Sequence, residues 1–337
     1  MELVVDFWDV GQGDCSVVRL PDEQLLIIDV GPPDSPLIEW LTARGEKIYG
    51  VVLTHNDEDH AGCFPDLLER FSTRIGKVFL LVDRDPTSVP AQRILGCAVR
   101  YAKKKHFTLH QLALPENEVL KIYGHDSGAE KLLIYGVHPE FLTALGNELK
   151  STPKPNNVSG IICLDIDGMT HLIWAGDAPM KTVGEKCSGK APEVMVGPHH
   201  GGPTDRGLKN HDLEYDKVNP RNVFISVGTT NRHDHPVKKF IDSHAARKRR
   251  VVCSQLVHCD NRKVEARQHV MRHHLDFGMV PPQNAGAVTC RGPMRLTWDT
   301  ESGEFAHDEY HALHLAELES VHRPYCLGGL MAHHAEV

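Results

Sequence analysis

The sequence predicts an α/β sandwich that contains two sheets. Short strand-like runs alternate with helix-like segments in both halves of the chain, and tight-turn signals join several strands into hairpins. In the clearest hairpin, runs at 161–166 and 171–175 flank Asp167-Gly168, a dipeptide typical of two-residue β-turns. A doubly wound parallel sheet is the rival architecture, but the hairpins favour mixed sheets.

Each predicted element of the first half has a local signal. Apolar runs at 3–8, 16–20 and 25–29 predict an antiparallel meander, because turn residues separate them. The run at 51–54 predicts a buried strand. Ser88 is a candidate N-cap for a helix in which apolar residues recur at helical spacing.

The strand pattern ends near Gly303. Runs at 287–289 and 294–298 predict a closing hairpin just before that point. We therefore expect one domain over residues 1–303, followed over residues 304–337 by an amphipathic helix, Ala306–His322, and a tail.

Composition excludes some classes of protein. The 337 residues carry a net charge of -8, whereas a free-standing nucleic-acid binder usually has a basic footprint. No apolar run reaches the ~18 residues of a membrane span, so no membrane partner is expected. The N-terminus resembles a strand rather than a signal peptide, and the nine cysteines are odd in number and irregularly spaced. These features predict free thiols and a cytoplasmic location.

The loop after the strand at 51–54 carries four potential metal ligands within six residues. They are His55, Asp57, Asp59 and His60. Imidazole and carboxylate together suit zinc, manganese or iron. Two metals could share the loop, with His55 and Asp57 on one and Asp59 and His60 on the other. The alternative is a solvated acidic loop.

Two more aspartates stand at the ends of predicted strands. Asp29 follows four apolar residues, so its carboxylate needs a partner if it is buried. Orienting the metal-binding loop would give it one. Asp177 lies in Ala175-Gly176-Asp177-Ala178, where small neighbours would let a carboxylate bridge two metals. Either aspartate alone could be an ordinary turn residue.

Two histidine-bearing loops complete the set. His199 and His200 follow the predicted strand 193–197 and precede two glycines that allow a tight turn. His233 and His235 follow the predicted strand 223–227. Either loop alone would more often be a surface loop. Together, five strand-end loops that bear histidine or aspartate predict one shared site.

These motifs resemble those of a known superfamily. The pattern His-x-Asp-x-Asp-His at 55–60 resembles the His-x-His-x-Asp-His signature of metallo-β-lactamases, with Asp57 at the second histidine. The other motifs follow in that superfamily's order. The chain looks like the branch that contains the hydrolase domain of the competence DNA-uptake protein ComEC, and the opening segment Asp9–Asp14 resembles that branch too. The membrane channel of ComEC has no counterpart, so we expect a stand-alone soluble relative.

The resemblance implies a fold and a ligand set. The fold would be a four-layer αββα sandwich, with residues 1–303 as the hydrolase domain and the site along one edge. Two divalent ions, zinc or manganese, would be held by His55, Asp57, Asp59, His60, Asp177, His199, His200 and His235.

By position, these ligands divide into two sets. His55, Asp57 and one of His199 or His200 would hold the first ion. Asp59, His60 and His235 would hold the second, and Asp177 would bridge the two ions. The supporting residues would be Asp29, Asn157, Ser159 and Asn231. Asn156, Asn157 and Ser159 occupy the region where the superfamily usually has a further histidine.

Such a site predicts a hydrolase. Two ions ~3.5–4 Å apart would hold a bridging hydroxide that attacks a phosphoryl or carbonyl centre. Asp59 could orient this hydroxide, and His233, or whichever of His199 and His200 is not a ligand, could protonate the leaving group. We expect a phosphodiesterase or nuclease that acts on DNA or nucleotides. The alternatives are a hydrolase of a lactone, thioester or phosphocholine ester, and an effector subunit that works only with partner proteins from a multi-gene system.

Two weaker features stay open. Cys253, Cys259 and Cys290 with His258 could form a zinc site, although the spacing favours buried free thiols. The basic runs at 103–105 and 247–250 resemble solvated helix ends. They would indicate a polyanionic substrate only if both flank the site.

Overall fold

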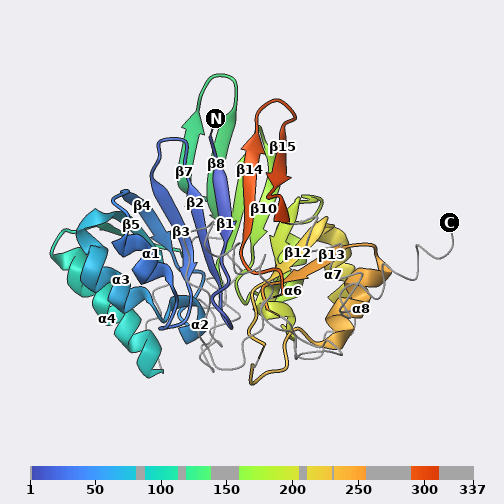
Figure 1. The fold of residues 1–337 in the computed structure, drawn as a ribbon, viewed down its shortest axis with the longest axis horizontal. Helices are drawn as coiled ribbons and strands as arrows, with labels where there is room; N and C mark the ends of the chain where they lie inside the picture. The colour runs from blue at the N-terminus through green and yellow to red at the C-terminus, as the bar shows by residue number, and fades with distance from the viewer. Residues whose placement is uncertain are drawn as a thin grey trace, which may run out of the picture.

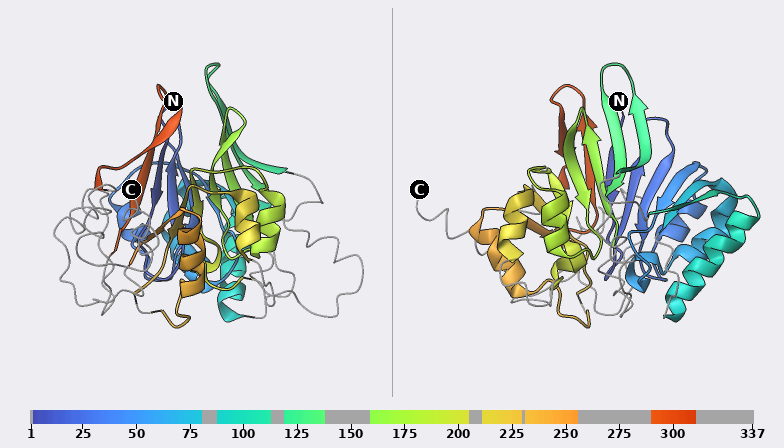
Figure 2. Two further views of the ribbon diagram at one scale, coloured as in Figure 1. Left: turned by 90° about the vertical axis from the view of Figure 1, so that its right-hand side faces the viewer. Right: turned by 180° about the vertical axis from the view of Figure 1, so that it is seen from behind.

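Two mixed β-sheets face each other in the computed structural model, which describes residues 2–80, 88–112, 119–137, 159–204, 211–229, 231–255 and 290–310. Helices cover the outer face of each sheet, so the layers run helix, sheet, sheet, helix (Figures 1 and 2). The expected four-layer sandwich is confirmed. The doubly wound parallel sheet is excluded, because both sheets contain antiparallel pairs.

The first sheet has the strand order β15-β14-β1-β2-β3-β4-β5-β6. Its strands are β1 Val4–Phe7, β2 Cys15–Arg19, β3 Leu25–Val30, β4 Ile48–Val52, β5 Ile75–Leu80, β6 Thr108–Gln111, β14 Met294–Asp299 and β15 Glu304–His307. Pairing is antiparallel from β15 to β3 and parallel from β3 to β6. The predicted N-terminal meander is therefore confirmed.

The second sheet has the order β13-β12-β11-β10-β9-β8-β7. Its strands are β7 Val119–Asp126, β8 Lys131–Val137, β9 Ile161–Ile166, β10 Met169–Trp174, β11 Val194–Val196, β12 Asn222–Ile225 and β13 Arg250–Cys253. Strands β9 and β10 form the predicted hairpin. Asp167 and Gly168 both have the positive φ that its tight turn requires.

Helices flank the two sheets on their outer faces. They are α1 Leu37–Thr42, α2 Glu58–Ala61, α3 Phe64–Phe71, α4 Val89–Lys103, α6 Met180–Lys186, α7 His211–Val218 and α8 Lys238–Ala246, with 3-10 turns η1 Ser72–Arg74 and η3 Pro198–Gly201. Helices α1, α3 and α4 lie beside the first sheet, and α6, α7 and α8 beside the second (Figure 1). Ser88 caps α4 as predicted, because its Oγ accepts a hydrogen bond from the Ala91 amide.

Strand β3 shows how the sequence builds the layers. Its side chains alternate, so Leu26 and Ile28 join the core between the sheets while Leu25 and Ile27 join the core beneath α1 and α3. Burying each of these side chains contributes about 1.5–3 kcal/mol. A strand that is buried on both faces has a fixed end, and Asp29 lies at that end.

The first sheet extends beyond Gly303. Strand β15 pairs with β14 from Asp299 and Glu304 to Leu296 and His307, so the expected loss of strand structure at Gly303 is wrong. The sequence underestimates this strand because its burial alternates over only four residues. The helix expected over Ala306–His322 does not begin at Ala306, because Ala306 and His307 belong to β15. Its part beyond residue 310 and the run at 287–289 lie outside the described residues. The division at residue 303 stays a prediction.

No helix of the described part of the chain is long and apolar enough to cross a membrane.

Candidate metal centre

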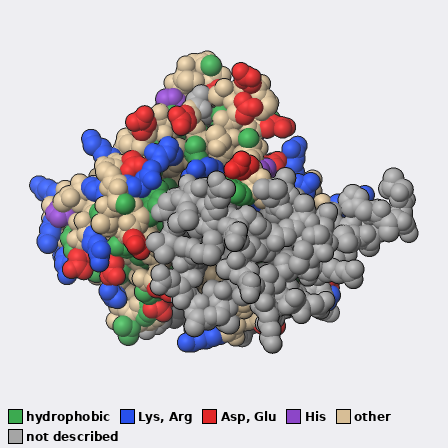
Figure 3. Space-filling model, in the orientation of Figure 1, with side chains coloured by type: hydrophobic (Ala, Val, Ile, Leu, Met, Phe, Trp, Pro, Cys, Tyr) green, Lys and Arg blue, Asp and Glu red, His purple; other side chains and the backbone are tan. Residues whose placement is uncertain are grey.

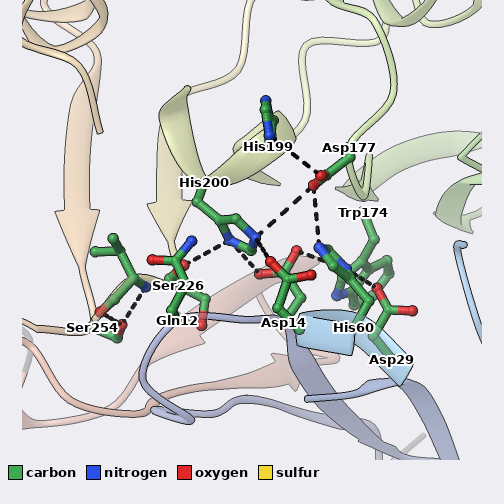
Figure 4. A network of polar contacts seen from close by, with 12 residues as sticks. Gln12, Asp14, Asp29, His60, Trp174, Asp177, His199, His200, Ser226 and Ser254 are labelled. Atoms are coloured by element: carbon green, nitrogen blue, oxygen red, sulfur yellow. Dashed lines mark hydrogen bonds and ion pairs between the residues drawn. The ribbon is translucent and has the colours of Figure 1, made fainter. Parts of the chain in front are cut away.

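Side chains from loops at one edge of the two sheets converge on Asp177 (Figure 4). These loops follow β3, β4, β10 and β11, and the turn between β1 and β2 joins them. We call residues 54–62 the metal loop and residues 9–14 the β1–β2 turn.

His55, His60 and Asp177 form the most deeply buried group. The His60 Nε2 atom lies 3.1 Å from Asp177 Oδ1, and His55 Nε2 lies 3.6 Å from Asp177 Oδ2. Both histidines are fully buried, and the aspartate is 3% exposed. One donor atom from each of the three lies within 4.8 Å of the others, which suits a shared cation.

Asp29 fixes the orientation of His60. Its carboxylate accepts hydrogen bonds from the Thr54 amide at 2.8 Å, the Thr54 hydroxyl at 2.7 Å and His60 Nδ1 at 2.9 Å. Nδ1 of His60 therefore carries a proton, which leaves Nε2, the atom that faces Asp177, as the one that could bind a metal. Asp29 contacts the metal loop as the sequence analysis expects, and its supporting role stays a prediction.

The two adjacent histidines of η3 differ in their surroundings. His200 is buried, donates from Nδ1 to the Ser226 carbonyl at 2.8 Å, and places Nε2 3.1 Å from Asp59 Oδ2. His199 has a side chain 26% exposed, donates to the Pro203 carbonyl, and places Nε2 3.6 Å from the nearer Asp177 oxygen. Both backbones have positive φ, which turns the two rings toward the same centre.

The His235 ring contacts the His199 ring, with ring centroids 4.9 Å apart. Asn231 holds its backbone, because the side-chain oxygen accepts from the His235 amide at 2.8 Å and the side-chain nitrogen donates to the His235 carbonyl at 2.9 Å. Any Cβ at Gly202 would come within 2.3 Å of the His235 ring, so glycine leaves the space that the ring occupies. Exposed His233 stacks on His235 with ring centroids 5.5 Å apart.

The other predicted residues lie at the margin or behind the centre. Asp57 has a side chain 36% exposed and lies 3.8 Å from His55 Nε2. Ser159 is buried, and its hydroxyl accepts from the Asp177 amide at 3.1 Å. Asn156 and Asn157 lie outside the described residues.

His60 belongs to two groups of possible ligands, one with His55 and Asp177 and one with Asp14 and His200, and Asp59 lies beside His200. The expected division of the ligands between two ions stays a prediction. The sequence gives the order of the motifs, but the direction in which each loop turns depends on contacts between strands far apart in the chain.

The electrostatics of the centre favour positive charge. Burial lowers the pKa of His60, but the carboxylates of Asp177, Asp59 and Asp29 outweigh it and hold that pKa well above its usual range. Burial also lowers the pKa of His200, but the nearby carboxylates outweigh this effect and raise that pKa to about 9. A cluster of carboxylates that attracts protons onto histidines would equally attract a divalent cation.

His235 is uncharged in these surroundings, and its ring nitrogens could bind a metal ion. Burial, together with the charges of His199 and His200, lowers the pKa of His235 to about 4. Within the described part of the chain, neither of its ring nitrogens has a hydrogen-bond partner. A neutral imidazole is the form that binds metal.

The residues present fit a divalent metal. His60, His199 and His200 each commit the Nδ1 proton to an acceptor, and each directs Nε2 at a carboxylate oxygen 3.1–3.6 Å away. A nitrogen lone pair facing a carboxylate is repulsive unless a proton or a cation lies between them. His55 Nε2 has no hydrogen-bond partner among the described residues either.

Sequence reasoning missed Asp14 as a member of this centre. Its carboxylate is buried and lies 3.6 Å from His200 Nδ1 and 3.8 Å from His60 Nδ1. The available signal was an aspartate between a glycine and a buried strand, which places a carboxylate at a strand end as Asp29 does.

Part of the chain matches a known family. The model of the metallo-β-lactamase superfamily matches residues 8–78, which include the β1–β2 turn, Asp29 and the metal loop. The chain has the metallo-β-lactamase fold. The similarity to the ComEC branch stays a prediction.

Several solved structures are similar to the chain. Igni18, a metallo hydrolase from the archaeon Ignicoccus hospitalis KIN4/I, is 17% identical with a TM-score of 0.44, over 74% of this chain and 94% of that one. The metallo-β-lactamase fold protein YhfI from Bacillus subtilis is 12% identical with a TM-score of 0.43, over 74% and 96%. The short form of human tRNase Z is 11% identical with a TM-score of 0.39, over 66% and 92%. Similarity at this level does not indicate a substrate.

The two weaker features lie apart from these contacts. Cys253 and Cys290 are both buried on neighbouring backbone segments, whereas His258 and Cys259 lie outside the described residues. Arg247 and Arg249 both contact Asp216, at 2.7 and 2.6 Å, so this basic run is partly neutralised. These contacts favour a solvated helix end rather than a surface that binds the phosphates of a substrate.

Proposed function

We propose that the chain is a two-metal hydrolase that cleaves phosphodiesters. The observation that carries the proposal is the set of imidazoles with Nδ1 held by an acceptor and Nε2 facing a carboxylate. This arrangement suits ligands that await a cation, and it recurs at His60, His199 and His200 around Asp177 and Asp59.

The residues that would hold the ions lie on both sides of Asp177. His55 and His60 contact it from the metal loop, and His199 approaches it from η3. Asp59 and His200 form a second pair of donors beside them. Two bound divalent ions would lower the pKa of a water molecule and offset the charge that develops on the attacked phosphoryl group.

Backbone and side-chain contacts position these donors before any substrate binds. Asp29 holds His60, the Ser226 carbonyl holds His200, and Asn231 holds the backbone of His235. Ligands fixed in this way need little reorganisation, and support of this kind typically affects metal affinity or activity by about 10–100-fold.

Asp59 and His233 are the proposed groups for proton transfer. The Asp59 side chain is 33% exposed, so one part can face substrate while Oδ2 faces His200. His199 directs its Nε2 atom at Asp177, as a metal ligand would, so we do not assign it this role. His233 is exposed and stacks on His235, which leaves its ring nitrogens accessible to a leaving group.

Charge supports a phosphodiester as the substrate class. The carboxylate-rich donor set suits hard ions such as Mn²⁺, which bind phosphate oxygens well. On the face that Figure 3 shows, Lys and Arg side chains are interspersed with Asp and Glu side chains over the described surface. With a net charge of -8, the protein should capture long nucleic acid weakly and in a salt-sensitive manner, unless a partner protein helps.

A substrate panel tests the proposal. Protein loaded with Mn²⁺ or Zn²⁺ is assayed against bis(p-nitrophenyl) phosphate, single-stranded DNA, a lactone, a thioester and a phosphocholine ester. We expect Mn²⁺-stimulated phosphodiester cleavage that is lost in Asp59→Ala and His60→Ala. Asp165→Asn, which changes a carboxylate on β9 bound to Tyr135 and Thr170, is the matched control and should keep activity. Cleavage of the other esters without any phosphodiester would contradict the proposal.

A further inference from the structure

A buried carboxylate from the β1–β2 turn lies beside two histidines of the centre. Asp14 Oδ1 is 3.6 Å from His200 Nδ1, and Asp14 Oδ2 is 3.8 Å from His60 Nδ1. The Asp14 side chain is 9% exposed, and Figure 4 shows it between the two rings. The carboxylate therefore faces the Nδ1 atom of each ring, whereas the Nε2 atoms face Asp177 and Asp59.

These contacts are electrostatic and are not hydrogen bonds. The Nδ1 protons go to other acceptors, that of His60 to Asp29 at 2.9 Å and that of His200 to the Ser226 carbonyl at 2.8 Å. Within the described part of the chain, Asp14 Oδ1 has no hydrogen-bond partner. The charge of this carboxylate is therefore balanced by the two imidazole rings, as a buried charge requires.

The turn is built to hold Asp14 at this place. The Asp14 amide donates to the Asp59 carbonyl at 3.2 Å, which ties the turn to the metal loop. A Cβ at Gly13 would lie 2.2 Å from that same carbonyl oxygen, and Gly13 has a φ of 143°, so glycine allows this approach.

The charge of Asp14 favours the state of the two rings that metal binding needs. Burial raises the pKa of Asp14 to about 6, while His200 and His60 lower it, so the carboxyl group is ionised at neutral pH. A negative charge beside Nδ1 stabilises the proton on that atom and leaves Nε2 as the atom that binds a metal. The same charge offsets the positive charge that a ring gains when its Nε2 binds a cation, and burial strengthens this attraction.

Asp14 serves two histidines that have different partners. His60 places Nε2 against Asp177, and His200 places Nε2 against Asp59. In the proposed two-metal centre these histidines belong to different pairs of donors. A charge that acts on both rings therefore acts on both metal positions.

We propose that Asp14 is a positioning residue whose carboxylate supports metal binding at His60 and at His200 together, without contacting either ion. The inference rests on the proposed two-metal function, and it adds a residue that links the two metal positions. Loss of this charge should weaken both ions, whereas loss of a ligand to one ion should weaken that ion most.

Metal binding, measured without substrate, tests the inference. Full-length wild type and Asp14→Asn are titrated at neutral pH with Mn²⁺ and Zn²⁺ against a chromogenic chelator, and bound metal is counted by elemental analysis. We expect Asp14→Asn to bind two ions at saturation, each with about 10-fold lower affinity. Wild-type affinity for both ions, or a loss confined to one ion, would overturn the shared role.

The visible spectrum of Co²⁺-loaded protein separates a positioning residue from a ligand. Replacing a ligand changes the donor set or the geometry around Co²⁺ and therefore shifts its absorption bands. At saturating Co²⁺, we expect the bands of Asp14→Asn to match those of wild type and the bands of His200→Ala to differ. Bands in Asp14→Asn that shift as they do in His200→Ala would make Asp14 a ligand and overturn the proposal.

A second buried aspartate provides the matched control. Asp6 is similarly buried near the start of the chain, but it pairs with Arg295. Asp6→Asn should lower the melting temperature of the metal-free protein and keep the affinity for both ions. The same pattern in Asp14→Asn would assign Asp14 a purely structural role and overturn the proposal. If Asp14→Asn does not fold, Asp14→Ser in the same titrations gives the answer.

The two proposals fail in different ways. Phosphodiester cleavage by wild type, together with unchanged metal affinity in Asp14→Asn, would overturn only the role of Asp14. Weakening of both ions in Asp14→Asn, in a protein that cleaves no phosphodiester, would support the role of Asp14 and overturn only the phosphodiesterase proposal.

Discussion

Asp29→Asn tests whether metal binding depends on the tautomer of His60. The substituted amide keeps the size of the carboxylate but has only one acceptor oxygen. Asp29 Oδ1 accepts from the Thr54 amide, while Oδ2 accepts from both the Thr54 hydroxyl and His60 Nδ1. The asparagine oxygen should stay opposite the Thr54 amide, because that backbone donor cannot rotate away.

The amide nitrogen would then face His60 Nδ1. His60 would respond by accepting at Nδ1 and moving its proton to Nε2, the atom that faces Asp177 at 3.1 Å. A protonated Nε2 cannot bind metal. We expect affinity for at least one ion to fall by about 10–100-fold, which corresponds to roughly 1.4–2.8 kcal/mol. The loss of a charge-assisted hydrogen bond should also lower the free energy of unfolding by about 1.5–3 kcal/mol.

Chelator competition measures the affinity, and chemical denaturation of the metal-free protein measures the stability. Asp165→Asn is the control, because Asp165 also accepts two side-chain hydrogen bonds but lies away from the centre. It should lose stability and keep metal affinity. Unchanged affinity in Asp29→Asn, beside a clear loss in His60→Ala, would refute the tautomer argument.

Three further predictions concern Asp177 as a bridge between the ions, His233 as the proton donor, and the loss of stability at low pH. Asp177→Asn should weaken both ions together, and elemental analysis that finds full occupancy would exclude a bridge. His233→Gln should lower kcat by about 10²–10⁴-fold with metal content unchanged, and an unaltered kcat would remove His233 from the mechanism. The hydrogen bond from His307 lowers the pKa of Glu193 below its ordinary value of 4.5, so Glu193 stabilises the fold above that pH and this stability is lost as the pH falls further. Unfolding titrations should show a shallower acid limb in Glu193→Gln, and identical limbs would contradict this coupling.

Much of the fold follows from the sequence, for a physical reason. Strand β3 has apolar residues at every position from 25 to 28, as a strand covered on both faces requires. The hairpin is predictable because Asp-Gly readily adopts the positive φ angles of a two-residue β-turn, as Asp167 and Gly168 do. By contrast, β15 was missed because its burial alternates over only four residues and much of its environment comes from β14.

The candidate site was predictable in part. Strand ends that carry histidine or aspartate indicate a shared edge, and parallel pairing of β3 with β4 does bring Asp29 beside Thr54. The sequence does not show which way each side chain turns. The choice between His199 and His200 depends on acceptors such as the Ser226 carbonyl, which lies 26 residues from His200 along the chain. Asp14 depends on the docking of a turn against the Asp59 carbonyl.

Anomalous diffraction from crystals of Mn²⁺-loaded protein tests the two-metal centre most directly. We expect two peaks about 3.5–4 Å apart, on either side of the Asp177 carboxylate. One should lie beside His55, and the other beside Asp59 and His200. A single peak in this cluster, or strong peaks elsewhere with none between these residues, would contradict it.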